Sequence, residues 1–123
     1  MGDRGAKYPR RLNLRDTAEV CFKIGTTGAG VVNSIVNDRH DAIDEVQHLG
    51  TGLFRIFLTD GWAELHGFEA HVLGTRDRVV FLSDVALGDR TIDFQVTDLS
   101  NNNQDLLSKQ IYLRLLLAST ANQ

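Results

Sequence analysis

The stretch Gly50-Thr51-Gly52-Leu53-Phe54-Arg55-Ile56-Phe57-Leu58 is the part of the chain from which the fold is most easily inferred. Two glycines flank a threonine, and a run of large apolar residues follows in which only Arg55 is charged. A short apolar run that ends at Asp60-Gly61 is typical of a β-strand buried on both faces or nearly so. We therefore expect residues 53–58 to form a central strand with the other strands placed around it.

Alternation of apolar and polar residues predicts further strands on both sides of this run. It is clearest at residues 91–97, where Ile92, Phe94 and Val96 would face the core. The other expected strands are residues 18–24, 31–36, 68–73, 78–82 and 111–117.

Two segments do not follow this alternation. Residues 42–49 alternate poorly, and we expect irregular extended chain with a short strand at its end. In residues 60–66, Trp62 and Leu65 have the spacing of one helical turn, which would close one end of the core. The phenylalanines at positions 54, 57, 68, 81 and 94 are expected in the core together with Trp62.

Short strands separated by turn residues, without a long amphipathic helix, predict an all-β protein. We expect an antiparallel β-sandwich, jelly-roll-like, with about seven or eight strands and one short helical turn. The domain would cover residues 18–118, preceded by an extended basic N-terminal arm (residues 1–17) and followed by a C-terminal tail (residues 119–123).

Size and composition exclude several classes of protein. A chain of 123 residues fits one domain, and no apolar run approaches the ~20 residues of a membrane-spanning helix. No apolar segment follows Met1, so we expect no secretory signal and synthesis in the cytoplasm. Cys21 is the only cysteine, so it has no partner for an intrachain disulfide and is expected to be a small buried thiol.

The N-terminal arm differs in charge from the rest of the chain. It carries five basic residues against two acidic ones, whereas the remainder carries 8 basic and 14 acidic residues. A basic arm suits an acidic protein surface or nucleic acid, and the alternative is a solvated terminus without a partner. Nucleic acid is the less favoured partner, because Arg10-Arg11 is too short a basic run and the body is acidic.

Alternating acids and histidines give the nearest approach to a chemical site. Glu64, His66, Glu69 and His71 are residue types that bind divalent metals. Their spacing is not that of a His-Glu-x-x-His helix, and side chains on the outer face of a strand are usually solvated. No serine lies in a Gly-x-Ser-x-Gly turn. We therefore expect no catalytic residues, no bound metal and no cofactor.

Residues 50–118 resemble small virion proteins of tailed bacteriophages. The resemblance rests on the strand opening at residues 50–54, the segments 68–72 and 92–96, the Asp105-Leu106 step and the last strand at 111–117. It implies a head decoration or cement protein, a β-sandwich on the capsid surface of the virion that is not an enzyme. The implied partners are the major capsid protein or other virion subunits, whose neighbouring copies it would bridge, often as a homo-dimer or homo-trimer.

Within this hypothesis, the arm's composition suggests that Tyr8, Arg10, Arg11 and Arg15 contact the shell and that Trp62 lies near an end or interface. A tail or fibre location is equally compatible with the sequence. A carbohydrate- or ligand-binding β-sandwich module is the alternative, and it would need Trp62 exposed beside Asp60 and Glu64. A metal-dependent enzyme built on Glu64, His66 and His71 is a third hypothesis.

Overall fold

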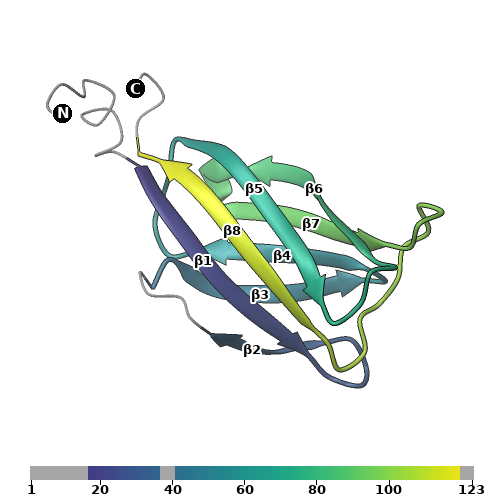
Figure 1. Ribbon diagram of the computed structural model, residues 1–123. Coiled ribbons are helices and arrows are strands. Elements are labelled where there is room, and N and C mark those ends of the chain that lie inside the picture. The colour runs from purple at the N-terminus through teal and green to yellow at the C-terminus, as the bar shows by residue number, and fades with distance from the viewer. Residues whose placement is uncertain (1–16, 37–40, 120–123) are drawn as a thin grey trace, which may run out of the picture.

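The computed structural model describes residues 17–36 and 41–119, which form eight strands and one short 3-10 helix (Figure 1). The strands are β1 (Thr17–Thr26), β2 (Val32–Val36), β3 (Ile43–Gly50), β4 (Leu53–Leu58), β5 (Glu64–Leu73), β6 (Val79–Ala86), β7 (Thr91–Thr97) and β8 (Gln110–Ala118). The 3-10 helix η1 (Leu87–Asp89) joins β6 to β7. No helix in the part of the chain that the structure describes is long and apolar enough to cross a membrane.

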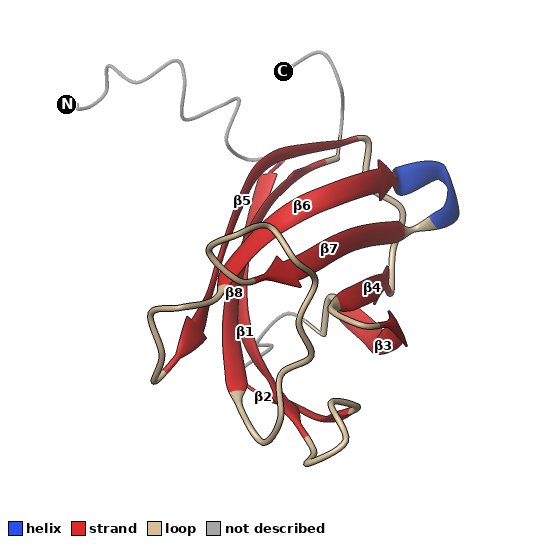
Figure 2. Ribbon diagram, turned by 90° about the vertical axis from the view of Figure 1, so that its right-hand side faces the viewer, coloured by secondary structure: helices blue, strands red, loops and turns tan. Residues whose placement is uncertain are grey.

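Two four-stranded antiparallel sheets, ordered β2-β1-β8-β5 and β3-β4-β7-β6, form the sandwich (Figures 1 and 2). This confirms the predicted all-β class and the strand count. Like a jelly roll, the fold has two four-stranded sheets packed on each other. Its strand order is not that of a jelly roll, which consists of two Greek keys, because β1 and β2, and likewise β3 and β4, form hairpins within one sheet. The connectivity was the part of the fold that the sequence pattern did not contain.

The core lies between the sheets and follows the predicted alternation. Phe54 in β4 and Phe94 in β7 are directly opposed cross-strand neighbours, and their rings stack with centroids 5.1 Å apart and planes 10° apart. The largest side chains with no exposed surface come from both sheets: Val20, Phe22, Ile24, Phe54, Ile56, Ile92, Phe94, Val96, Ile111, Leu113, Leu115 and Leu117. The central strands β8 and β7 therefore supply much of the apolar contact between the layers.

Two predictions about local structure were wrong. Residues 64–66 are not part of a helical turn but open β5, where Glu64 pairs with Ala118 and Leu65 with Leu117 of β8. Residues 43–50 form one continuous strand, β3. Bulges at Ile43/Glu45 and His48/Gly50 interrupt its alternation of buried and exposed residues. In both places pairing with a neighbouring strand decided the structure, which local periodicity cannot reveal.

Two predictions about burial also need correction. In β4 only one face is fully buried, because Leu53, Arg55 and Phe57 are half-buried on the outer face of the sheet. Arg55 is held there by two hydrogen bonds to the Asp93 carboxylate on β7, at 2.8 and 3.0 Å. Phe81, expected in the core, is 39% exposed, because it pairs with Gln95 of β7 on the outer face of the sheet.

Gly52, in the turn of the β3–β4 hairpin, is hydrogen-bonded to the loop that precedes β8. Its N–H donates to Asp105 Oδ1 at 2.9 Å, and its carbonyl accepts the Val96 N–H at 2.8 Å. The same Asp105 oxygen lies 2.8 Å from His48 Nε2. The N–H of Gly52 and the His48 ring lower the pKa of the Asp105 carboxyl, because both stabilise its charged form. Gly52 has φ +69°, a backbone conformation that favours glycine.

Candidate functional site

The candidate site is the open side of the sandwich where β5 and β6 lie next to each other (Figure 2). Each of these strands is hydrogen-bonded on one side only, β5 to β8 and β6 to β7. No strand is hydrogen-bonded to the other backbone edge of either. An edge strand of this kind is a ready template for binding a further strand.

Exposed apolar side chains gather on β6. Val79, Phe81, Leu82 and Val85 are between 36% and 41% exposed, and they make up four of the nine large exposed hydrophobic residues in residues 17–36 and 41–119. Single exposed apolar residues are ordinary, whereas several on one edge strand mark an interaction surface. We call these four residues and the free backbone edge of β6 the β6 edge.

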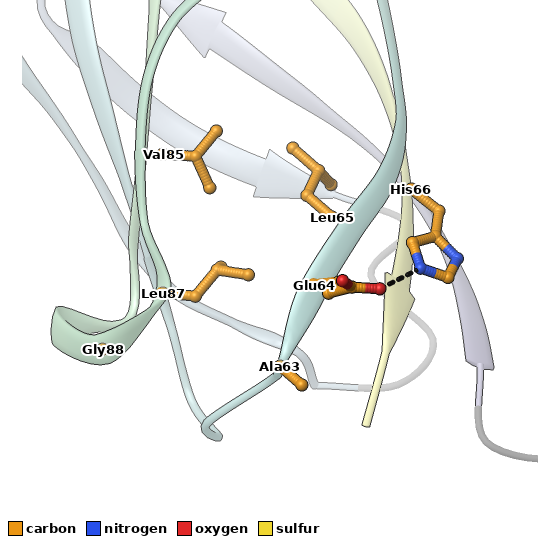
Figure 3. Close-up of a pocket in the computed structure, with 7 residues that line it drawn as sticks. All are labelled: Ala63, Glu64, Leu65, His66, Val85, Leu87 and Gly88. Atoms are coloured by element: carbon orange, nitrogen blue, oxygen red, sulfur yellow. Dashed lines mark hydrogen bonds and ion pairs between the residues drawn. The ribbon is translucent and has the colours of Figure 1, made fainter. Parts of the chain in front are cut away.

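A groove of about 520 Å³ lies between the β6 edge and the start of β5. Figure 3 shows Val85 and Leu87 on one wall pointing toward Leu65 on the other. Glu64 and His66 border the β5 side, where His66 Nε2 lies 2.7 Å from Glu64 Oε1. Apolar side chains from both strands thus share the lining of this groove with Glu64 and His66, and the larger part of the lining surface is polar.

The other three sheet edges carry features that discourage pairing with another chain. β2 is only five residues long, β3 carries Asp44 and Glu45, and β5 carries Glu64 and Glu69 beside two histidines. The β6 sequence contains no lysine, arginine or proline, and its only charge is Asp84. Natural edge strands usually use short length, charge, proline or bulges against stray pairing. Only the bulge at Leu82/Asp84 and this one charge protect β6.

The residues predicted to contact a partner are distributed differently. Tyr8, Arg10, Arg11 and Arg15 lie outside the described residues. Trp62 precedes β5, packs against the core and is only partly buried. Its indole N–H is buried and has no hydrogen-bond partner. The Trp62 ring therefore lies against the core and is only in part accessible to solvent.

The four residues considered for a metal site do not converge. Glu64 and His66 pair with each other, Glu69 Oε1 lies 3.8 Å from Arg114, and the His71 ring packs against Tyr112 at 5.3 Å. No group of three or more metal-binding side chains occurs in the part of the chain that the structure describes. Each carboxylate or imidazole here already has a neighbour within its own sheet.

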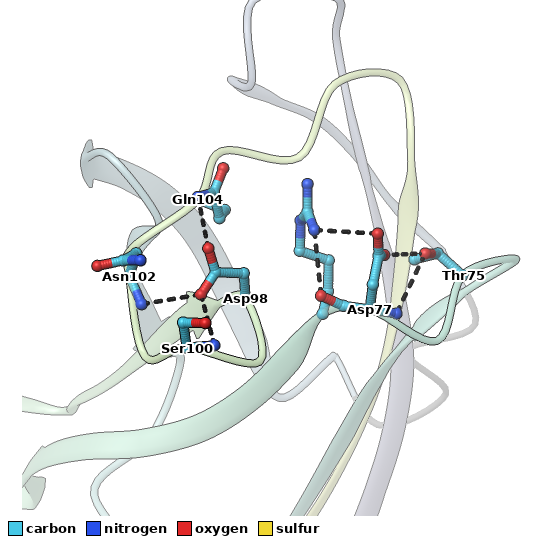
Figure 4. Close-up of polar contacts among 7 residues, drawn as sticks. Thr75, Asp77, Asp98, Ser100, Asn102 and Gln104 are labelled. Atoms are coloured by element: carbon cyan, nitrogen blue, oxygen red, sulfur yellow. Dashed lines mark hydrogen bonds and ion pairs between the residues drawn. The ribbon is translucent and has the colours of Figure 1, made fainter.

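A second polar cluster, at the ends of β5 and β7, is satisfied internally (Figure 4). Asp98 accepts the backbone N–H groups of Asn102 and Ser100 at 3.1 and 2.8 Å, and these bonds lower its pKa. Asp77 accepts a hydrogen bond from the Thr75 hydroxyl, which lowers the pKa of that carboxyl. These acids order their own loops, as capping carboxylates do, and have few lone pairs left for a ligand.

Comparisons with protein families, with curated proteins and with solved structures found no match. The function is therefore argued from the geometry of the site. Sequence reasoning missed the β6 edge because residues 78–82 have the composition of a buried strand. One feature of the sequence could have indicated an edge strand open to a partner: residues 79–86 contain no basic residue and no proline.

Proposed function

We propose that this chain is a non-catalytic structural protein that binds other protein subunits through the β6 edge and the adjacent groove. The proposed setting is a tailed-phage virion, where it would decorate the capsid and bridge neighbouring copies of the major capsid protein. The observation that carries the proposal is the concentration of exposed apolar side chains on an edge strand that is hydrogen-bonded on one side only. The capsid setting rests on the resemblance of residues 50–118 to small virion proteins.

The physical case for assembly has two parts. A rigid sandwich presents its edge already formed, so little conformational entropy is lost when a strand of another subunit adds to it. A shell offers many identical sites, so contacts that are individually weak give firm attachment when a bridging protein binds two of them. Both arguments apply to a tail subunit as well, and the resemblance is the reason for choosing the capsid.

The alternative of a carbohydrate- or ligand-binding module receives less support from the geometry. It would need an open aromatic face at Trp62, yet this ring packs against the core. The groove combines Leu65, Val85 and Leu87 with Glu64 and His66, and these two polar side chains are already hydrogen-bonded to each other.

The test is co-sedimentation of the full-length chain with shells assembled from the major capsid protein encoded in the same genome. Val85→Lys places a charge on the β6 edge, and Val36→Lys is the matched control on β2, since the two valines are 38% and 42% exposed. We expect the wild type and Val36→Lys to sediment with shells and Val85→Lys to bind at least tenfold more weakly. Thermal unfolding of each variant verifies that it is folded.

Two results would overturn the proposal. One is a wild-type chain that stays in the supernatant at every shell concentration. The other is equal binding by the two lysine variants, which would place the contact somewhere other than the β6 edge.

A further inference from the structure

We infer that a second pocket, between the β5–β6 turn and the segment that leads into β8, binds a carboxylate group. The carboxylate belongs either to a small organic acid or to an acidic side chain of a partner protein. The pocket has a volume of about 370 Å³. Thr75, Asp77 and Arg78 form one wall, and residues 104–107 with Lys109 form the other. No residue of β6 lines the pocket, so this site is separate from the β6 edge.

The two acidic side chains of the pocket are already engaged within the protein. The Asp77 carboxylate accepts a hydrogen bond from the Thr75 hydroxyl. Asp105 Oδ1 accepts the Gly52 N–H at 2.9 Å and lies 2.8 Å from His48 Nε2. The Thr75 hydroxyl and the Gly52 N–H are the main causes that lower the pKa of the Asp77 and Asp105 carboxyls. Both acids therefore serve to hold loops of this chain in place.

The two cationic side chains of the pocket keep unused hydrogen-bond donors. Among residues 17–36 and 41–119, Lys109 Nζ has no hydrogen-bond or ion-pair partner, and Arg78 uses only Nη1. Nη1 donates to the Asp77 carbonyl oxygen at 3.1 Å and lies 3.4 Å from the Asp77 carboxylate. Both cations contribute to the lowered pKa of Asp77, so both act on the same region of the pocket. Charged N–H donors without a protein acceptor favour a ligand with an anionic group.

The balance of charge and the size of the pocket favour a carboxylate on an apolar body. Asp77 and Asp105 offset Arg78 and Lys109 in number, so a doubly charged phosphate would be repelled more strongly than a singly charged carboxylate. The volume lies within the roughly 300–1,000 Å³ of ordinary ligand sites and exceeds what a lone small anion fills. Leu107, on the same wall as Lys109, is 54% exposed and offers an apolar contact beside the cations.

The backbone around Lys109 is fixed independently of its side chain. The Lys109 N–H donates to Thr26 Oγ1 at 3.0 Å, and its carbonyl accepts the Thr26 N–H at 2.8 Å. The Gln104 N–H donates to the Val96 carbonyl at 3.0 Å on the same wall. The pocket is thus already formed before a ligand arrives, which reduces the entropy lost on binding. Replacement of the Lys109 side chain should leave these backbone bonds intact.

An NMR titration of the full-length chain tests the site with a matched pair of probes. N-acetylleucine carries a carboxylate beside an apolar side chain, and N-acetylleucinamide has the same body without the charge. We expect the acid to shift the backbone amide signals of residues 75–78 and 104–109 with a dissociation constant on the order of millimolar. The amide should bind about tenfold more weakly, because it makes no charge-assisted hydrogen bond.

Two variants distinguish the pocket from a general effect of charge. Lys109→Gln removes one lining cation and should weaken binding of the acid about fivefold. Arg76→Gln is the matched control, because it makes the same change in net charge at an exposed residue that does not line the pocket. Three results would contradict the inference: no saturable shift up to about 50 mM acid, equal binding of acid and amide, or equal weakening by the two variants.

Co-sedimentation of Lys109→Gln with capsid shells separates the two sources of the carboxylate. Weaker shell binding than that of Arg76→Gln would assign the carboxylate to a shell subunit, whereas unchanged binding would assign it to a free organic acid. The site does not depend on the proposed function. A wild-type chain that ignores shells would remove the capsid role, and the NMR titration would still decide whether the pocket binds a carboxylate.

Discussion

Replacing Gly52 with alanine should disrupt the junction between the β3–β4 hairpin and the loop before β8. A Cβ atom at this position would lie 2.5 Å from the Val96 carbonyl oxygen and 2.9 Å from both the nitrogen and the oxygen of Gln104. The Gln104 N–H donates to that same Val96 carbonyl at 3.0 Å. The new methyl group would therefore have to separate two backbone segments, and no side-chain rotation can relieve the contact.

The expected loss of stability can be estimated from the contacts involved. The left-handed conformation at φ +69° costs a residue with a Cβ about 1–2 kcal/mol. Displacement of the loop weakens the bond from the Gly52 N–H to the Asp105 carboxylate and the bond from Gln104 to Val96, together worth about 2–3 kcal/mol. The sum of about 3–5 kcal/mol is a large part of the roughly 6–18 kcal/mol available to a chain of 123 residues.

Urea unfolding measures this loss, with fluorescence of Trp62, the only tryptophan, as the signal. Gly61→Ala is the control, because a Cβ at Gly61 meets no atom within 4 Å and the backbone there is not left-handed. We expect Gly61→Ala to change the free energy of unfolding by less than about 1 kcal/mol. A Gly52→Ala variant within 1 kcal/mol of the wild type would refute the reasoning, since it would mean that the loop moves away at little cost.

Other predictions concern Asp105 and the core. Because the pKa of Asp105 is lowered in the folded state, its contribution is present at neutral pH and is lost as the pH falls below about 4 and through the folded value. Asp105→Asn should therefore destabilise the protein by about 1–2 kcal/mol at pH 7 and by less at pH 3, measured by urea unfolding at both pH values; an equal loss at both would contradict the role of charge. Leu115→Ala, at a site with no exposed surface, should cost about 2–5 kcal/mol in the same assay, and a loss below 1 kcal/mol would show that the core collapses around the cavity.

The sequence predicted best where a strand lies inside a sheet with one face on the core. In β1, β7 and β8 the strands have neighbours on both sides, so alternation alone determines which residues are buried. Val20, Ile92 and Leu113 have no exposed surface, as the pattern requires. The physical reason is that residues i, i+2 and i+4 of a strand lie on the same face, so a face that packs on the core buries all of them.

Prediction failed where backbone pairing, rather than side-chain periodicity, decides the structure. Trp62 and Leu65 have the spacing of a helical turn, yet the backbone of Glu64 and Leu65 pairs with the end of β8. The bulge at Leu65/Gly67 shifts the alternation at this point and hides the strand from pattern analysis. Bulges at both ends of β3 have the same effect. The position of a bulge depends on the partner strand, so the residue pattern of the bulged strand alone does not reveal it.

The candidate site could not be predicted for a related reason. Residues 79–86 have the apolar content of an interior strand, and the exposure of Leu82 and Val85, which pair with buried residues of β7, follows from the place of β6 at the end of the order β3-β4-β7-β6. That order depends on the long-range pairing of β4 with β7, which leaves β6 with one partner. β6 thus has the composition of an interior strand but lies at the edge of its sheet, with a neighbouring strand on one side only. An apolar edge strand with only one bulge and one charge against stray pairing is the strongest physical reason to look for the protein's function at β6.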